Sequence, residues 1–148
     1  MEGGMESSKL HKLLGKAYRM HEKRSLAELS KINITPGQYC ILNYLSRHDG
    51  CIQKDLSLHC GLEPSVVTNM LSGMLKSGLV RRESDASDRR AWHVLVTERG
   101  VQFHRQAEEI LTNIDSISLE GFSDREKALF QSYLIRMYHN LKKAEKQK

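Results

Sequence analysis

The stretch Gly61–Gly100 reads GLEPSVVTNMLSGMLKSGLVRRESDASDRRAWHVLVTERG, and its first part predicts a helix over residues 63–77. Pro64 suits the first turn of this helix, where the missing N–H would form no intrahelical bond anyway. Gly78 suits the position just after the helix, because glycine adopts the left-handed conformation that ends many helices. The apolar residues in between recur at helical spacing and give one face to bury: Val67, Met70, Leu71, Met74 and Leu75.

The second part of the stretch predicts a β-hairpin with a basic tip. Residues 79–83 and 91–96 are short runs of strand-forming residues, and the charged residues 84–90 lie between them. Residues 76–90 hold five basic and three acidic side chains, so this segment carries a net charge of five minus three, or +2. A basic loop beside a helix can reach DNA phosphates or the neighbouring minor groove.

The outward face of the predicted helix carries short polar and methyl-bearing side chains: Ser65, Val66, Thr68, Asn69 and Ser72. Such groups suit the DNA major groove, whose base edges offer hydrogen-bond partners and whose thymines offer a methyl group. The alternative interpretation is a plain amphipathic helix with a solvated outer face. The basic hairpin beside it favours the DNA-binding interpretation.

The same stretch resembles the MarR family of winged helix-turn-helix regulators. The positions that match the family's pattern are Leu62, Ser65, Val67, Thr68, Lys76, Gly78, Leu79, Val80, Asp85, Asp88, Arg90, Thr97 and Gly100. A weaker resemblance extends over the rest of the chain. The sequence departs from the pattern at Asn69, where the family often has Arg, and at Val96, where it often has Leu.

The resemblance implies a mainly α fold with a small β-hairpin wing (α+β), in which a winged helix-turn-helix is joined to a bundle of terminal dimerisation helices. Residues 1–33 would form the N-terminal dimerisation helix, 34–100 the DNA-binding region and 101–148 the C-terminal dimerisation helices, within one compact domain. The implied function is a dimeric, sequence-specific repressor released by a small-molecule effector. Its recognition helix, 63–77, would enter the major groove, and its wing, 84–90, would lie at the minor groove.

The terminal helices carry more apolar surface than a small DNA-reading core can cover. The apolar residues of the last helix run near heptad spacing: Leu129, Phe130, Tyr133, Leu134, Met137 and Leu141. These helices could pack on their own chain alone, but a two-fold symmetric bundle is favoured because it is the commonest oligomer. A homodimer would place two recognition helices about one DNA turn apart on a palindromic double-stranded operator.

Two sets of site residues follow from the resemblance and from side-chain chemistry. The expected DNA-binding residues are Ser65, Val66, Thr68, Asn69, Ser72, Lys76, Asp88, Arg89 and Arg90. Arg90 is expected to enter the minor groove with its guanidinium held by Asp88, and Asn69 is expected to read adenine. The expected effector-binding residues, each with an apolar body and a polar handle, are Tyr18, His21, Tyr39, Asn43 and His104.

Small aromatic or phenolic effectors bind the resembled family between its DNA-reading and dimerisation helices, which is why these five residues are candidates. Core packing with satisfied polar tips is the alternative for them. His104 and Glu108 are four residues apart, a spacing that metal ligands use, but a solvated or pocket-lining pair is favoured. His21 and Glu22 begin a metalloprotease-like motif that Ser25 fails to close. Neither a metal nor a cofactor is expected, and the chain is not expected to be an enzyme.

Local signals predict where the other helices begin and end. Ser7 or Ser8 can cap a first helix that runs to about residue 32. Thr35-Pro36-Gly37-Gln38 predicts a capping box at the second helix, which Asp49-Gly50 would end. A third helix is expected over 53–60, without a good cap.

Two further caps belong to the C-terminal part of the sequence. Thr97 can cap a long helix that Gly121-Phe122 breaks. Ser123 and Glu126 form a second capping box, at the start of the last helix.

Composition sets the outer limits of this interpretation. The 148 residues suffice for one domain, and the net charge of +5 permits nucleic-acid binding without requiring it. No apolar run approaches the roughly 18 residues of a membrane span.

Cys40, Cys51 and Cys60 form no Cys-x-x-Cys pair, which favours a reducing cytoplasm. Cys40 and Cys60 are expected to be buried and Cys51 to be more accessible. A winged-helix protein-interaction module without DNA readout is the alternative function.

Overall fold

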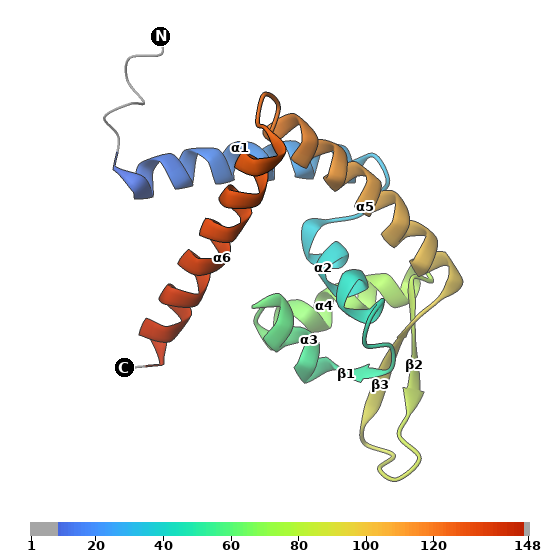
Figure 1. Ribbon diagram of the computed structural model, residues 1–148. Coiled ribbons are helices and arrows are strands. Elements are labelled where there is room, and N and C mark those ends of the chain that lie inside the picture. The colour runs from blue at the N-terminus through green and yellow to red at the C-terminus, as the bar shows by residue number, and fades with distance from the viewer. Residues whose placement is uncertain (1–8, 147–148) are drawn as a thin grey trace. The chain divides into compact units, whose positions relative to one another are not determined.

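The computed structural model describes residues 9–146, a mainly helical chain with one small sheet (Figure 1). Its elements are α1 (Leu10–Ser30), α2 (Pro36–Leu45), β1 (Cys51–Ile52), α3 (Gln53–Cys60), α4 (Pro64–Lys76), β2 (Val80–Ser84), β3 (Trp92–Val96), α5 (Glu98–Ser118) and α6 (Asp124–Glu145). The chain divides into two compact units, 1–114 and 115–148, with the boundary inside α5. The expected fold class, mainly α with a β-hairpin wing, is confirmed.

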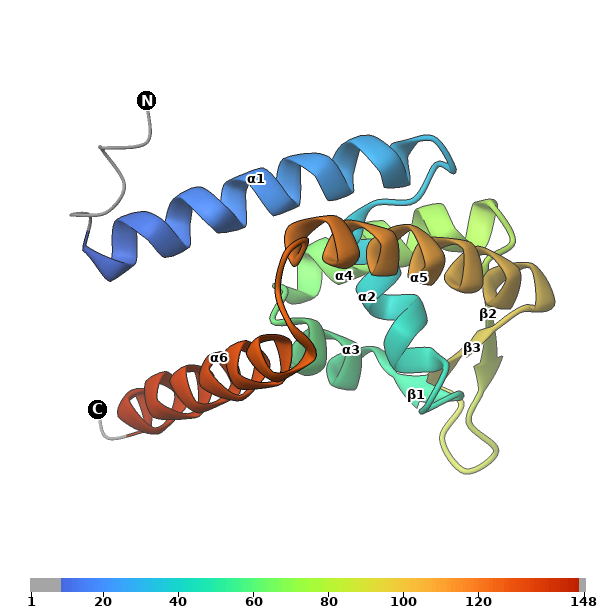
Figure 2. The ribbon, with the colours of Figure 1, turned by 45° about the horizontal axis from the view of Figure 1, so that its top comes forward.

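The core of the first unit lies where α2, α3 and α4 meet the sheet (Figure 2). Leu42, Leu56 and Leu71 come from these three helices, and each is 0% exposed. Val94 of β3 adds a buried side chain at 1% exposure. Because apolar burial is the main favourable term in folding, this cluster fixes the position of α4 against the sheet.

The sheet is antiparallel with the strand order β1-β3-β2. Its hairpin pairs Val80 with Val96 at the base and Ser84 with Trp92 near the tip. The two-residue strand β1 pairs with β3 through Cys51 and Val94, and sequence reasoning missed it. Two residues are too few to show an alternating pattern, so this strand is defined by its tertiary partner alone.

The expected helix caps are present at α2, α5 and α6. The Thr35 hydroxyl accepts from the Gln38 N–H at 3.2 Å, and the Gln38 side chain accepts from the Thr35 N–H at 3.0 Å. Ser123 forms the same reciprocal pair of bonds with Glu126. The Thr97 hydroxyl accepts from the Gly100 N–H at 3.0 Å. Each cap satisfies backbone N–H groups that the helix itself leaves unpaired.

Helix α4 begins and ends as its sequence indicates. Pro64 lies in its first turn, and Gly78 follows it with a φ of 72°. The Leu79 N–H then donates to the Met74 carbonyl at 2.9 Å, and the Gly78 N–H donates to the Leu75 carbonyl at 3.1 Å. These two bonds form a Schellman motif, which turns the chain sharply into β2.

The structure differs from the sequence-based expectation at the end of α2. This helix ends at Leu45, before the expected Asp49-Gly50. The N–H groups of Arg47 and His48 both donate to the Tyr44 carbonyl, which tightens the chain into turns. Asp49 instead accepts from the Val96 N–H at 2.8 Å and so anchors this turn to β3. The expected cap at Ser7 or Ser8 lies outside the described residues.

Candidate nucleic-acid interface

The helices α3 and α4 form a helix-turn-helix whose two members are joined by a tight turn and by side chains. Gly61 adopts a left-handed conformation, with φ 61°, between the two helices. Gln53, at the start of α3, donates from its amide to the Thr68 hydroxyl at 2.5 Å. The Thr68 hydroxyl in turn donates to the Pro64 carbonyl at 2.9 Å. These bonds hold the first turn of α4 against the start of α3.

The residues expected to read DNA share the exposed face of α4. Ser65, Val66, Thr68, Asn69, Ser72 and Lys76 are all exposed. The opposite face is buried, with Val67, Leu71 and Met74 each 0% exposed. The structure therefore brings the six helix candidates together on a single surface and separates them from the core.

The wing turn is shaped by two aspartates that accept main-chain hydrogen bonds. Asp85 Oδ1 accepts from the Ser87 N–H at 2.7 Å and from the Asp88 N–H at 3.2 Å. Asp88 Oδ1 accepts from the main-chain N–H of Arg90 at 2.9 Å. This second bond shapes the backbone of the tip, and the bond from Asp88 to the Arg90 guanidinium stays a prediction. The side chains of Arg89 and Arg90 remain exposed at the tip.

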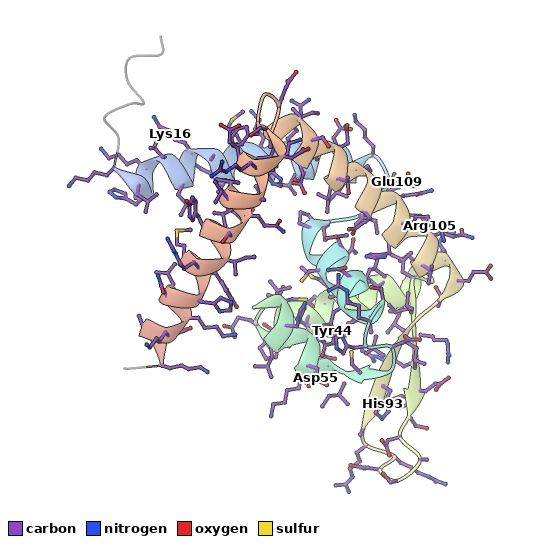
Figure 3. All side chains as sticks on the ribbon, in the orientation of Figure 1. Lys16, Tyr44, Asp55, His93, Arg105 and Glu109 are labelled. Atoms are coloured by element: carbon purple, nitrogen blue, oxygen red, sulfur yellow. The ribbon has the colours of Figure 1, made fainter. Side chains whose placement is uncertain are left out.

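His93 links the wing to the turn before β1, and sequence reasoning did not identify it (Figure 3). Its Nε2 lies 2.7 Å from Asp85 Oδ2, and its Nδ1 lies 2.6 Å from the Gly50 carbonyl oxygen. The bond to Asp85 is the main cause that raises the pKa of His93, and the Gly50 carbonyl adds to it. The same bond, together with those from Ser87 and Asp88, holds the pKa of Asp85 well below its usual range. A single histidine in a strand gives no signal that would reveal these contacts.

Three of the expected effector residues come together between α2 and α5. The Tyr39 and His104 rings stack with their centroids 5.8 Å apart, and His104 Nε2 lies 3.3 Å from Asn43 Oδ1. Glu108, for which a solvated or pocket-lining pair with His104 is favoured over a metal site, accepts from the Tyr39 hydroxyl at 2.5 Å and lies 3.7 Å from His104 Nε2. Burial, followed by the bond to Glu108, raises the pKa of Tyr39.

The other two expected effector residues lie on α1. Tyr18 is 60% exposed, and its hydroxyl donates to Glu22 Oε1 at 3.0 Å within the same helix. His21 is half-buried, and its carbonyl accepts from the Ser25 hydroxyl at 2.8 Å. Both of these bonds lie within α1. Tyr39, Asn43 and His104 take part in bonds that join α2 to α5.

The three cysteines are all half-buried, so Cys51 is not distinguished by the greater accessibility that was expected. A hydrogen bond between the thiols of Cys40 and Cys60 lowers the pKa of Cys40 to about 7 and raises that of Cys60. Burial raises the pKa of Cys51 to about 11. Since the thiolate is the reactive form, Cys40 is the most readily ionised thiol of the three.

Two other kinds of feature, a metal site and a membrane span, can be considered for residues 9–146. Within this range, no group of three or more His, Cys, Asp or Glu side chains is placed to hold a metal ion. None of the helices in the same range is both long enough and apolar enough to cross a membrane.

The chain is similar in sequence to one family model and to several transcriptional regulators. Residues 32–91 match the model of the MarR family. The chain is 29% identical over 124 residues to the transcriptional regulator HosA of Escherichia coli, covering 84% of this chain and 90% of that protein. It is also 29% identical over 118 residues to the HTH-type transcriptional regulator YsmB of Bacillus subtilis, covering 78% of this chain and 79% of that protein.

Solved structures share the fold over nearly the whole chain. A MarR transcriptional regulator from Methanosarcina mazei Go1 superposes with a TM-score of 0.81 at 25% identity, covering 91% of this chain and 97% of that one. A mutant MarR from E. coli, complexed with operator DNA, has a TM-score of 0.77. At 19% identity, over 86% of this chain and 92% of that one, this second likeness concerns the fold alone.

Proposed function

This chain belongs to the MarR family of transcriptional regulators, and we propose that it is a homodimeric repressor of a palindromic operator that a small-molecule effector releases. The relatives are transcriptional regulators, a non-enzymatic family, which confirms that the chain is not an enzyme. The E. coli MarR mutant of the same fold was solved with operator DNA, so the fold is compatible with DNA binding. A regulator of this kind would work in the cytoplasm, beside the DNA.

The observation that carries the proposal is the composition of the exposed face of α4. Ser65, Asn69 and Ser72 present short polar groups there, and Val66, which is 38% exposed, presents methyl groups. A solvated helix gains nothing from an exposed valine, whereas the major groove offers thymine methyl groups to it. We assign base reading to this face, with Thr68 stabilising its first turn through Gln53.

The basic residues beside this face would contact the DNA backbone. Lys76 lies at the end of α4, and Arg89 and Arg90 lie at the tip of the wing. The Asp88 carboxylate, already bonded to the Arg90 N–H, would position these arginines through the main chain. Arginine suits a narrow minor groove, where the negative potential of DNA is strongest.

The homodimer is supported by apolar side chains that neither unit covers by itself. On α1, Leu10 is 69% exposed, Tyr18 60% and Met20 66%. In α6, none of the described residues is buried, and Leu134 is 38% exposed. Exposed apolar surface on this scale marks an interaction site. We therefore propose dimerisation through the terminal regions, 1–33 and 101–148, with residues 34–100 contacting DNA.

The effector would bind beside Tyr39, Asn43 and His104. These side chains combine two stacked rings, a phenol and an imidazole, with an amide, which suits an aromatic ligand bearing a hydroxyl or carboxyl group. Tyr18 and His21, on α1, remain proposed members of the same site. An effector that bonded to Tyr39 or His104 would compete with Glu108 and so alter the contact between α2 and α5.

The proposal is tested by selecting duplexes from a random pool with the purified chain and measuring affinity by fluorescence anisotropy over a salt series. The selected fragments should share a palindrome, and log Kd should rise linearly with log salt. A scrambled duplex of equal length is the control, and it should bind more weakly with a similar salt dependence. Absence of retention on any duplex at low salt would instead favour a winged-helix protein-interaction module.

A further inference from the structure

His93 has a hydrogen-bonding environment that only one protonation state satisfies. Its Nδ1 faces the Gly50 carbonyl oxygen at 2.6 Å, and its Nε2 faces the Asp85 carboxylate at 2.7 Å. A carbonyl oxygen and a carboxylate oxygen both accept hydrogen bonds and donate none. A neutral imidazole has a single N–H, so one of its nitrogens would direct a lone pair at an acceptor. The imidazolium has two N–H groups and satisfies both.

We propose that protonated His93 is a positioning residue that fastens the wing to the turn before β1 and thereby presents Arg89 and Arg90 to DNA. The proposal rests on the DNA-binding function proposed above and adds to it a control of the wing by pH. Affinity for DNA should be highest when the imidazole is protonated, and it should fall when the ring loses its proton.

The contacts of Asp85 connect His93 to the tip of the wing. While Oδ2 of Asp85 accepts from His93, its Oδ1 accepts from the N–H groups of Ser87 and Asp88. Asp88 then accepts from the Arg90 N–H. Each bond fixes the backbone of the next residues, so release of Asp85 would loosen the turn that carries both arginines.

The charged groups around His93 come from three sides. Glu83 of β2 lies directly opposite it in the hairpin register, and Arg81 forms an ion pair with Glu83. Asp85 and the tip residues Asp88, Arg89 and Arg90 belong to the wing. On the β1 side, Asp49 and Cys51 flank Gly50, and Ile52, the register partner of His93, is uncharged.

The balance of these groups gives the direction of the pH effect. Asp85, the Gly50 carbonyl and Glu83 all raise the pKa of His93 above its ordinary value of 6.5, and burial opposes them. A raised pKa means that the fastening is complete below the ordinary value and is lost as the pH rises through the raised one. The pKa of Asp85 is lowered, so its carboxylate stays charged throughout that range.

The test measures DNA affinity between about pH 5.5 and about pH 9 at constant ionic strength, a range that spans ordinary and raised histidine pKa values. The wild type should lose about three- to tenfold more affinity over this range than His93→Gln, whose amide does not titrate. His11→Gln, which alters an exposed histidine on α1 outside the wing and the turn before β1, is the control and should follow the wild type. Parallel profiles for the wild type and His93→Gln would overturn the proposal.

A second variant and an NMR measurement test the role of His93 separately from the proposed DNA-binding function. Asp85→Asn removes the main cause of the raised pKa, so the pH at which affinity falls should move downward. In the DNA-free wild type, His93 should show two protonated ring nitrogens at pH values below its ordinary pKa of 6.5, and the Ser87 and Asp88 amides should titrate with it as the pH rises above that value. A neutral ring there would overturn the proposal. If the wild type bound DNA at no pH, the proposed DNA-binding function would be contradicted. The NMR titration of the DNA-free protein would still test the role of His93 in the wing.

Discussion

Asn69 carries an amide on the exposed face of α4, among hydroxyls and methyl groups. An amide can pair with both hydrogen-bonding positions of adenine in the major groove. Asn69→Ala should therefore weaken binding to the selected operator by about 1–3 kcal/mol and leave a scrambled duplex nearly unaffected. The slope of log Kd against log salt should stay the same, because no charge is removed. Equal loss on both duplexes, measured by anisotropy, would contradict base reading at this position.

Arg90 differs from Asn69 because its proposed partner is the charge of the DNA and not a base edge. Arg90→Ala should weaken binding to operator and scrambled duplexes alike and lower the salt slope by roughly one unit. Its main-chain N–H, which bonds to Asp88, is retained in the variant, so the wing turn should keep its shape. Arg105→Ala, on α5 (Figure 3), removes an equal charge outside the proposed interface. The interpretation fails if both variants change the slope equally.

The residues that sequence reasoning identified and those it missed differ in how their contacts arise. The face of α4 and the capping box of Thr35 with Gln38 depend on residues close together in the chain. Tyr39 and Glu108 come from different helices, and His93 reaches Gly50 across the sheet. Spacing along the sequence carries no signal for such pairs, because tertiary packing alone brings them together.

At the scale of elements, Gly100 marks the closest approach between α5 and the chain entering β2. A Cβ at this position would overlap the Leu79 carbonyl oxygen and a methyl group of Val96. Because the nearest obstacle is backbone, it cannot move aside as a flexible side chain would. Gly100→Ala should therefore lower the free energy of unfolding by about 1–3 kcal/mol, as overpacking in a core does. Urea unfolding followed by circular dichroism would measure it.

Gly73 of α4 is the matched control for Gly100, because both glycines lie within helices. A Cβ built on Gly73 meets nothing within 4 Å. Gly73→Ala should therefore raise the free energy of unfolding by about 0.5–1 kcal/mol through helix propensity. Opposite signs for the two alanine variants are expected, and a loss of stability at Gly73 would contradict the described geometry of α4.

The boundaries of elements show what local sequence can and cannot define. Both ends of α4 agree with Pro64 and Gly78, since each residue acts through its own backbone. The end of α2 was misplaced because Asp49-Gly50 resembles a helix stop, although its role is tertiary. Asp49 bonds to Val96, and the Gly50 N–H bonds to the Val94 carbonyl. The turn therefore belongs to the sheet more than to the helix before it.

At the scale of the whole molecule, the exposed apolar side chains of α6 make dimerisation testable. Leu134 is 38% exposed and Met137 is half-buried, and both lie on the near-heptad stripe. Replacing both with Lys would place two charges without partners in the proposed interface, an expensive change. The dimer should weaken by at least about a hundredfold, and sedimentation velocity at micromolar concentration should show monomer.

Ser132→Lys provides the control for the double variant, because it adds a charge to α6 away from the stripe and should leave the dimer intact. Circular dichroism should show that the double variant keeps its helices. A dimer contacts both half-sites of a palindrome at once, which increases its affinity for the whole operator. The monomer should therefore lose most of this affinity. Binding to a scrambled duplex depends on the charge of each subunit and should change far less. An unchanged dimer would place the interface elsewhere in the chain. A wild type that is monomeric and still binds the operator with full affinity would contradict the proposal that a dimer reads a palindrome.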